Sequence, residues 1–383
     1  MSKEEIKPEL VSICTTFFNA GEHLHRLIRS SLNQTYKDIE VILVDDVSND
    51  NSGEICLDFA KKDSRIKYFQ NTTRIGVTDS LLRSFSLAEG KFIVFVGSDD
   101  WLAGHFIENG VKIYSKQPEI AGVVPRVITL EESNNKIGEF SYIHNISFPS
   151  NIYKSEWLLH KIYKGSIPVA TVAALMRKDD AMRFFDYFYK NYINNSLIPE
   201  ELRSFCIMKG LLIDNISFIE ILTRYKKFSF DNSLVYIKIK HSENIAYPTL
   251  LPNSMSKIFK SCYYTLLTYQ IPYKIHWPNI YRKMKIFMAT EAIATTFIYS
   301  IKSRLRLYYF DIKESKKWLV LLLNDFSFFE IVIALLFIIP RIIYRFFSYI
   351  VRMISRKIWP DKKIPPEIFI HENFLNSEGR FTI

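Results

Sequence analysis

Cysteine is scarce in this sequence, and none of the cysteines is placed for a metal site or a disulfide framework. The four residues lie far apart, without a CxxC pair or the spacing of a zinc knuckle: Cys14, Cys56, Cys206 and Cys262. We therefore expect a reducing compartment. The first ten residues are charged and lack the apolar core of a signal peptide, which favours a cytoplasmic protein.

Glycine and proline are also few, with 12 and 14 among 383 residues, which excludes a collagen-like or low-complexity chain. The hydrophobic share of 48% instead indicates a folded protein. The net charge of +10 indicates an anionic partner, which could be nucleic acid, acidic lipid or a phosphate-bearing substrate. The basic residues concentrate in the apolar C-terminal region rather than on an aromatic-studded face, so we expect no nucleic-acid partner.

The sequence has no apolar run of the roughly 20 residues that a membrane-spanning helix needs. Its most apolar stretch, residues 328–339, is interrupted by Pro340. Basic residues then recur among apolar ones: Arg341, Arg345, Arg352, Arg356 and Lys357. This pattern is typical of an amphipathic helix held at an anionic membrane surface, so we expect peripheral attachment to the inner face of the cell membrane. The alternative is a helix buried against the rest of the chain or in a homo-oligomer.

The first hundred residues alternate between strand-like and helix-like segments. Apolar runs at residues 10–18, 39–44 and 91–96 predict strands, with amphipathic helices between them. Continuous apolar strands in this order indicate an α/β, Rossmann-like fold, with a mostly parallel sheet and helices on both faces.

The character of the chain changes near Leu250. Beyond it the sequence becomes rich in Tyr and Phe, basic, and helical in pattern. We therefore predict two domains, residues 1–250 and a helical, membrane-associating region over residues 251–383.

Two acidic pairs follow predicted strands. Asp45 and Asp46 come after the second apolar run, and Asp99 and Asp100 follow the run at 91–96. Parallel sheets bind ligands at the carboxyl ends of their strands. Carboxylates so close together repel each other unless a cation or hydrogen-bond donors lie between them, and hard oxygen ligands suit Mg²⁺ or Mn²⁺ beside substrate phosphates. A turn with a helix cap would explain either pair alone, but both together predict a metal site.

These motifs carry a resemblance to the family 2 glycosyltransferases. Residues 11–19 (VSICTTFFN) resemble the family's opening strand, VSVIIPTYN, and residues 30–36 (SSLNQTY) resemble its S.L.QTY segment. Residues 39–50 resemble EVIVVDDGSTD, with Val47 where glycine is usual, and residues 97–102 resemble DSDDWL. The resemblance implies a GT-A fold and an inverting, metal-dependent transfer of a sugar from a nucleotide-diphosphate donor, with a UDP-sugar favoured, to a glycan or lipid-linked acceptor.

The resemblance also implies a nucleotide site. Thr16 and Asn19 would lie beside the base and ribose, and Asp46, with Asp45 nearby, would contact the base. Arg74 is a candidate for a phosphate contact, because Leu81 and Leu82 stand where many relatives carry Arg-Asn. Arg83 is more simply explained as a surface charge.

The metal motif implies a second set of roles. Ser98 and Asp99 would face the ribose or sugar of the donor, and Asp100, with Asp99, would ligate Mn²⁺ or Mg²⁺, which neutralises charge on the leaving diphosphate. Gly97 replaces the first Asp of the usual motif, so one potential ligand is missing. His241, at the end of a segment that resembles the family strand VYYRIH, is a further candidate near the metal.

An inverting transfer needs a general base for the acceptor hydroxyl. The family's ED motif corresponds in place to Glu200 and Glu201, of which Glu201 is the first candidate, although Glu is also common in the first turn of a helix for its charge alone. Asp179 and Asp180 are rivals for this role. Two other functions stay open at this point: a catalytically inactive GT-A scaffold, which the changes at Gly97 and Leu81 suggest, and a nucleotidyltransferase.

Overall fold

The computed structural model describes the chain in segments: residues 9–21, 23–132, 140–146, 150–155, 157, 174–195, 200–209, 220–221, 224–240 and isolated positions from 286 to 337. The chain divides into two compact units, residues 1–244 with 363–383, and residues 245–362. The predicted boundary at Leu250, the predicted membrane helix at residues 341–357 and His241 lie outside the described residues. No helix among the described residues is long and apolar enough to cross a membrane.

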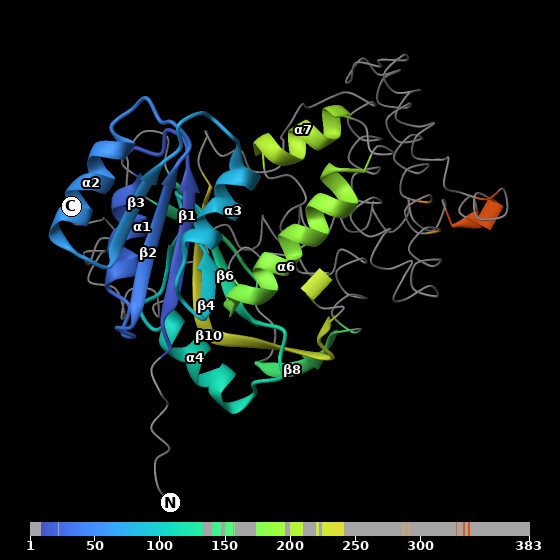
Figure 1. The fold of residues 1–383 in the computed structure, drawn as a ribbon. Helices are drawn as coiled ribbons and strands as arrows, with labels where there is room; N and C mark the ends of the chain where they lie inside the picture. Colours follow the sequence, from blue (N-terminus) through green and yellow to red (C-terminus); the bar gives the residue numbers. More distant parts are fainter. Residues whose placement is uncertain are drawn as a thin grey trace, which may run out of the picture. The chain divides into compact units, whose positions relative to one another are not determined.

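The first sheet is mostly parallel, as the apolar runs predict (Figure 1). Its strands, in spatial order, are β3 (Ile66–Gln70), β2 (Ile39–Asp45), β1 (Val11–Phe17), β4 (Phe92–Phe95) and β9 (Met176–Arg177). Every residue of β1 and β2 is buried, which is why these strands are apolar without alternation. The antiparallel edge strand β9 was not predicted, because two residues leave no recognisable pattern.

Helices cover both faces of this sheet. They are α1 (His23–Leu32), α2 (Ser52–Lys62) and α3 (Val77–Leu87). The chain moves along the sheet from β1 to β3 and then returns to β4, so right-handed crossovers place α1 and α2 on one face and α3 on the other. In agreement, α1 packs beside α2, and α3 packs against two later helices, α6 (Lys178–Phe188) and α7 (Glu200–Lys209). The expectation of an α/β fold with two covered faces is confirmed.

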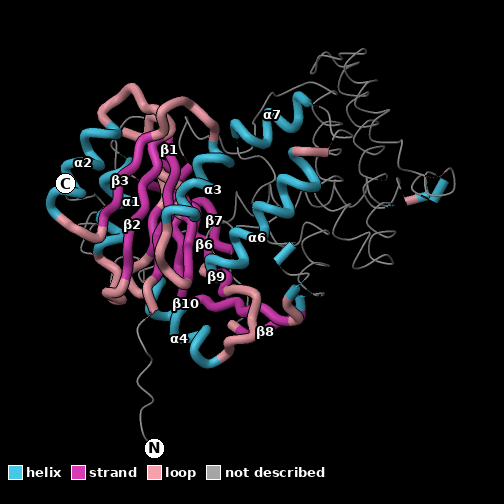
Figure 2. Tube along the Cα trace, in the orientation of Figure 1, coloured by secondary structure: helices cyan, strands magenta, loops and turns pink. Residues whose placement is uncertain are grey.

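A second, mixed sheet was not predicted (Figure 2). Its strands are β5 (Trp101–Leu102), β10 (Lys227–Lys240), β6 (Val123–Glu132), β7 (Phe140–Ile146) and β8 (Asn151–Lys154). The sequence pattern predicts only the second half of β10, because the polar residues 231–233 interrupt its apolar alternation. The register of β10 against β6 shifts between Asp231 and Val235, so this polar stretch forms an irregularity within one long strand.

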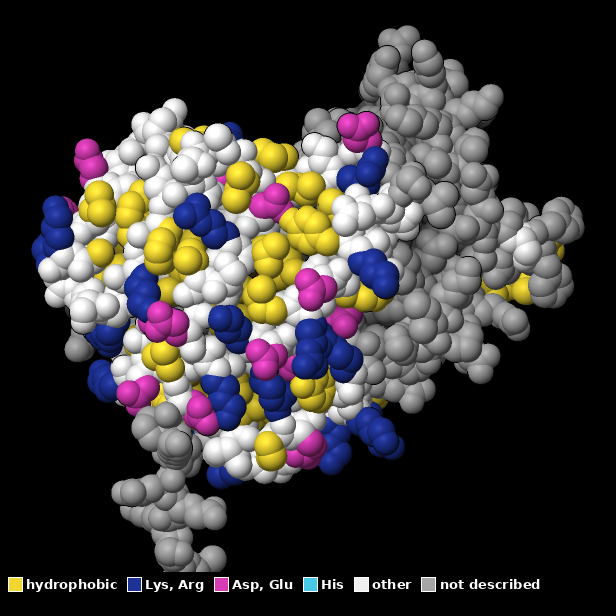
Figure 3. All heavy atoms as spheres, viewed as in Figure 1, with side chains coloured by type: hydrophobic (Ala, Val, Ile, Leu, Met, Phe, Trp, Pro, Cys, Tyr) yellow, Lys and Arg dark blue, Asp and Glu magenta, His cyan; other side chains and the backbone are white. Residues whose placement is uncertain are grey.

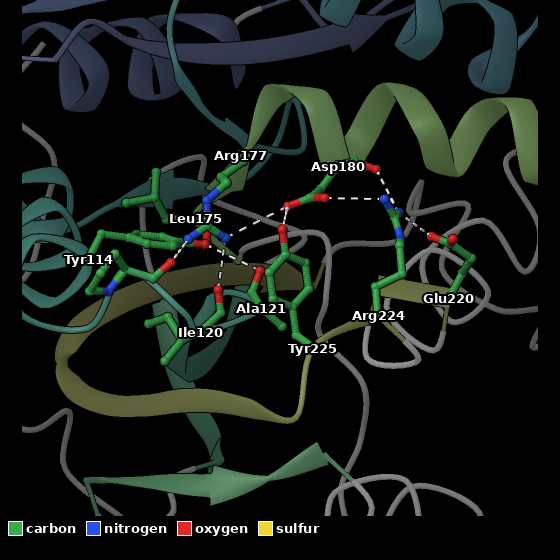
Figure 4. A network of polar contacts seen from close by, with 10 residues as sticks. Tyr114, Ile120, Ala121, Leu175, Arg177, Asp180, Glu220, Arg224 and Tyr225 are labelled. Carbon is green, nitrogen blue, oxygen red and sulfur yellow. Dashed lines mark hydrogen bonds and ion pairs between the residues drawn. The ribbon is translucent and has the colours of Figure 1, made fainter. Parts of the chain in front are cut away.

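A polar network around the buried Asp180 joins α6 to the segments that precede β6 and β10 (Figure 4). The Asp180 carboxylate, 2% exposed, accepts hydrogen bonds from Arg224 Nη1 at 3.2 Å and from the Tyr225 hydroxyl at 2.7 Å. Arg177 lies 3.7 Å from the same carboxylate and donates to the Ile120 carbonyl at 2.8 Å. Asp180 is therefore a structural residue, whereas its neighbour Asp179 is exposed.

Acidic and basic side chains are interspersed on the face drawn in Figure 3, in the region of α4 (Phe106–Lys116). Lys112 lies 2.6 Å from Glu108 within α4, and Lys91 lies 2.7 Å from Glu9. Exposed pairs of this kind stabilise a protein by less than about 1 kcal/mol. They balance charge locally on this face.

Candidate nucleotide and metal site

The two acidic pairs lie at the same edge of the first sheet, as predicted. Phe17, the last residue of β1, pairs with Asp45 of β2, and Val96, just past β4, donates its N–H to the Cys14 carbonyl at 3.0 Å. Strand β1 therefore separates the ends of β2 and β4, which lie about 10 Å apart, two strand spacings. The carboxyl edge of the parallel sheet thus carries both motifs.

The Asp45 carboxylate is fully buried and bonded within the protein. Its Oδ1 accepts a hydrogen bond from Ser48 N at 2.7 Å. Its Oδ2 accepts from the Tyr68 hydroxyl at 2.9 Å and from Gln70 Nε2 at 3.2 Å. These bonds tie the turn after β2 to the neighbouring strand β3. A base contact by Asp45 stays a prediction, and the geometry gives this residue a structural task.

Asp46 fixes the loop that leads into α3. Its Oδ1 accepts hydrogen bonds from Asn71 Nδ2 and from Ile75 N, both at 2.8 Å, and its Oδ2 accepts from Gly76 N at 2.9 Å. The side chain is only 4% exposed, so this carboxylate acts as the anchor for the loop over residues 71–76. Hydrogen bonds to a charged acceptor are about twice as strong as neutral ones.

Gly76 carries this loop past helix α7. Its φ of +90° lies in the region that L side chains rarely adopt. A Cβ here would lie 2.7 Å from the Ile207 carbonyl oxygen and 2.7 Å from Met208 Cα. Only glycine therefore allows the loop and the α7 backbone to approach so closely.

Arg74 lies over an exposed aromatic ring at the same edge. Its guanidinium carbon is 3.5 Å from the centroid of the Phe18 ring, and its Nε is 3.9 Å from Asp46 Oδ2. The Arg74 side chain is 46% exposed, which leaves it within reach of an anionic ligand. Arg83, in contrast, donates to the Gln70 carbonyl at 3.2 Å and contacts Asn71 Oδ1, so it supports the loop.

The turns after β1 and β2 each contain one non-glycine residue in the left-handed region. Asn19 has a φ of +53° and Val47 a φ of +65°. Asn19 accepts from Asn49 N at 3.0 Å through its side chain, and its own N–H donates to Ser48 Oγ at 2.9 Å. The positive φ of Val47 explains why glycine is usual there, since a β-branched residue in this conformation is strained. Asn19 is exposed, whereas Thr16 on β1 is buried.

The loop between β4 and β5 carries the second acidic pair. Asp100 is 7% exposed, while Ser98 and Asp99 are partly exposed. Asp100 Oδ2 and Asp99 Oδ1 lie 2.9 and 3.1 Å from one point, the position that a Cβ on Gly97 would take. The two carboxylates therefore converge on the space beside Gly97.

This donor set fits a hard divalent cation. Mg²⁺ and Mn²⁺ commonly bind one or two carboxylates together with substrate phosphates, and Asp99 and Asp100 supply two converging carboxylates at the ligand-binding edge. Among the described residues, no group of three His, Cys, Asp or Glu side chains is gathered for a metal ion.

The candidates for the general base are placed only in part. Glu200 begins α7 and is exposed, and Glu201 follows it in the same helical turn, with its side chain outside the described set. The helix begins where the sequence predicts it. Of the rival pair, Asp180 is buried and accepts hydrogen bonds from Arg224 and Tyr225, which gives it a structural task, whereas Asp179 is exposed and stays a candidate.

Sequence reasoning missed two residues of the site, Asn71 and Tyr236. The Asn71 amide donates to both Asp46 and Ser80, at 2.8 and 2.9 Å. The Tyr236 hydroxyl donates to Asp100 Oδ2 at 2.6 Å. The resemblance to VYYRIH marks the strand that holds Tyr236, but a contact across 136 residues leaves no local signal.

The N-terminal part of the chain is similar to known proteins. Residues 12–182 match the family described as glycosyl transferase family 2. The protein "Glycosyltransferase GlyG" of Streptococcus pneumoniae is 39% identical over 100 residues, which cover 26% of this chain and 33% of that protein. "UDP-Glc:alpha-D-GlcNAc-diphosphoundecaprenol beta-1,3-glucosyltransferase WfaP" of Escherichia coli is 35% identical over 103 residues, 27% of this chain and 40% of that protein.

The fold extends further than the sequence similarity. The crystal structure of S. aureus TarS 1–349 in complex with UDP-GlcNAc superposes with a TM-score of 0.54, covering 81% of this chain and 79% of that one. At 15% identity this similarity concerns the fold alone, a Rossmann-like GT-A arrangement. The chain spans less than half the length of the two curated relatives.

Proposed function

We propose that this chain, whose residues 12–182 form a family 2 glycosyltransferase domain, transfers a sugar from a nucleotide-diphosphate donor to a hydroxyl group of a glycan or lipid-linked acceptor. The observation that carries the proposal is the placement of Asp46, Asp99 and Asp100 at the carboxyl edge of a parallel sheet inside that domain. UDP is the favoured nucleotide, supported by the UDP-Glc and UDP-GlcNAc in the names of a relative and a structural neighbour.

Different residues of the chain would bind the base, the diphosphate and the sugar of the donor. The loop held by Asp46, with Thr16, Asn19 and the Phe18–Arg74 pair, would receive the base and ribose. Arg74, half-exposed, would approach the diphosphate, while Ser98 and Asp99 would face the donor ribose or sugar.

Asp100, with Asp99, would hold Mn²⁺ or Mg²⁺ against the diphosphate. A bound divalent cation neutralises the charge that develops on the leaving diphosphate. His241, the next residue in the sequence after the end of β10, is proposed as a further residue near this ion. The convergence of two carboxylates beside Gly97 supports this assignment.

Inversion of configuration requires one carboxylate to remove the proton from the acceptor hydroxyl. Glu201, with Glu200 as second candidate, is proposed for this role. Helix α7, which both residues begin, packs against α3, and its residues 207–208 lie directly against the loop that Asp46 anchors. The acceptor side would thus be built on the same loop as the donor side.

The acceptor and location are proposed from a relative and from the sequence. The relative from Escherichia coli has a name that states a diphosphoundecaprenol acceptor. An enzyme on such an acceptor works beside a membrane, and the basic, apolar residues 341–357 suit an anionic lipid surface. We propose a cytoplasmic protein attached peripherally to the membrane, with a homo-oligomer as the competing explanation of the apolar C-terminal region.

A thermal-shift screen with UDP, GDP, dTDP and CMP, each with and without Mn²⁺, tests the donor site. A ligand that binds the folded state stabilises it by about 2.7 kcal/mol at a hundred times its Kd. We expect a shift with UDP that requires Mn²⁺ and is absent in Asp100→Asn. A folded protein that none of these nucleotides stabilises would overturn the proposal and favour an inactive scaffold.

A second assay separates enzyme from scaffold. With a panel of UDP-sugars and membranes that contain lipid-linked glycans, an active transferase releases UDP and labels the lipid fraction with the sugar. Release of pyrophosphate from a nucleoside triphosphate would instead identify a nucleotidyltransferase. Nucleotide binding without either product would leave a binding protein.

A further inference from the structure

We infer that Tyr236 is a positioning residue that holds the Asp100 carboxylate in the orientation that binds the metal ion. The inference deepens the proposed function and rests on it. The Tyr236 hydroxyl contacts the Asp100 carboxylate, so Tyr236 would act on the metal ion through Asp100.

The Tyr236 hydroxyl joins both ends of the loop over residues 97–100. It donates to Asp100 Oδ2 at 2.6 Å and accepts from Gly97 N at 3.2 Å. A phenol hydroxyl has a single hydrogen to donate, and here Asp100 receives it. The short distance is that of a hydrogen bond to a charged oxygen.

The second sheet fixes the tyrosine in this place. Tyr236 of β10 pairs with Leu102 of β5, and its neighbour Ile237 pairs with Trp101. The Tyr236 side chain is 4% exposed, and Trp101 and Leu102 are 1% exposed or less. Because β5 begins directly after Asp100, the same strand pairing that holds the ring also sets the distance from the ring to the carboxylate.

Glycine at residue 97 leaves room for this carboxylate. A Cβ at residue 97 would lie 2.9 Å from Asp100 Oδ2, closer than real Cβ contacts allow. The oxygen that Tyr236 holds therefore occupies space that exists only because residue 97 is glycine. Residue 97 therefore lacks the first carboxylate of the usual motif. The Tyr236 hydroxyl instead donates a hydrogen bond to Asp100, one of the two carboxylates that remain. Residues that orient a metal ligand in this way typically contribute about ten- to a hundredfold to metal affinity.

The test compares Tyr236→Phe with Tyr114→Phe. Both tyrosines are almost fully buried, and the Tyr114 hydroxyl lies 3.3 Å from the Ala121 carbonyl oxygen and 3.2 Å from that of Leu175, either of which can accept its single hydrogen. Mn²⁺ is titrated into each protein with saturating UDP, and free Mn²⁺ is followed by electron paramagnetic resonance. Melting temperature in metal-free buffer reports the structural cost of each change.

We expect both variants to melt at a lower temperature but only Tyr236→Phe to bind Mn²⁺ about tenfold or more weakly. Excess Mn²⁺ should restore sugar transfer in Tyr236→Phe and have no such effect in Asp100→Asn. Unchanged Mn²⁺ affinity in Tyr236→Phe, with loss of binding in Asp100→Asn, would overturn the inference and leave the proposed function intact. Absence of Mn²⁺ binding in the unaltered protein would overturn both.

Discussion

The guanidinium carbon of Arg74 lies 3.5 Å from the centroid of the Phe18 ring, while its Nε is 3.9 Å from the Asp46 carboxylate. The cation is thus held from two sides at the carboxyl edge of the sheet. A cation–π contact at an exposed position contributes about 0.5–1 kcal/mol, which holds the side chain near one orientation without burying it.

Arg74→Ala should weaken UDP binding about tenfold, because a hydrogen bond to a charged group contributes roughly 1.5–3 kcal/mol. Isothermal titration with Mn²⁺ present, at low and at high salt, measures the effect and should show a weaker salt dependence in the variant. Arg65→Ala is the matched control, since Arg65 pairs with Asp63 and precedes β3, at the other end of the sheet. Equal UDP affinity in both variants would remove Arg74 from the site.

Asp46→Asn should destabilise the protein by about 1–3 kcal/mol and abolish the nucleotide-induced thermal shift. The amide nitrogen that replaces Oδ2 is itself a hydrogen-bond donor and cannot accept from the Gly76 N–H. The loop over residues 71–76 therefore loses part of its anchor. Urea unfolding and the thermal-shift screen measure the two effects. Asp58→Asn, which alters only an exposed 3.8 Å pair with Lys61, should change neither quantity.

Gly97→Ala should reduce Mn²⁺-dependent transfer more than it reduces stability. The added methyl group would lie 2.9 Å from Asp100 Oδ2 and 3.1 Å from Asp99 Oδ1, so both carboxylates must move. The comparison is Gly122→Ala, where the nearest atom, the Leu175 carbonyl oxygen, is 3.4 Å away. The Mn²⁺ concentration that gives half-maximal rate is the measurement, and an unchanged value in Gly97→Ala would contradict the arrangement.

Glu201→Gln should lower kcat about 10²- to 10⁴-fold while UDP binding stays unchanged, if this residue removes the acceptor proton. Glu200→Gln provides the comparison within the same helical turn. The single-turnover rate of the unaltered protein should fall at acid pH, where the general base is protonated. The variant that lacks the true base should show no such fall. A normal rate in both variants would exclude the pair.

Glu40 should make stability depend on pH in the acid range. Burial by itself would raise the pKa of Glu40, but hydrogen bonds from Lys67 and Ser12 and from the Glu89 N–H hold it below its ordinary value. A lowered folded pKa means that its stabilisation is present above the unfolded value of about 4.3 and is lost as the pH falls through the lower folded value. Urea unfolding should therefore show Glu40→Gln less stable at pH 7, with the difference shrinking in acid. A difference that is constant with pH would contradict this linkage.

Much of the first sheet can be predicted from the sequence because its buried strands are largely apolar runs. The polar residues at their carboxyl ends follow from the same pattern, so the positions of Asp46 and Asp100 could be predicted without coordinates. The two-residue strands β5 and β9 carry no periodicity, and the polar residues 231–233 conceal the first half of β10. For the second sheet the sequence pattern therefore predicts strands at residues 122–130 and 234–239, but not how they pair into a sheet.

The bonds within the site were less predictable than its location. Asp45 and Asp46 are adjacent and chemically identical, yet one faces Tyr68 and Gln70 and the other faces the Gly76 loop. Successive side chains along a strand point in opposite directions. The groups that donate hydrogen bonds to each carboxylate, however, are identified only by the folded structure. The contact of Tyr236 with Asp100 depends on a sheet that the sequence pattern does not reveal.

The loop over residues 71–76 is held by a carboxylate of the chain itself. A nucleotide bound at this edge, as we propose, would meet a loop that the protein already holds in place, and the entropy of ordering that loop would be lost during folding. Such a nucleotide would bind to a preformed site, without closure of a mobile loop around it. Selectivity among nucleobases would be set by shape and by fixed donors, and would survive changes in temperature that loosen sites built from mobile segments.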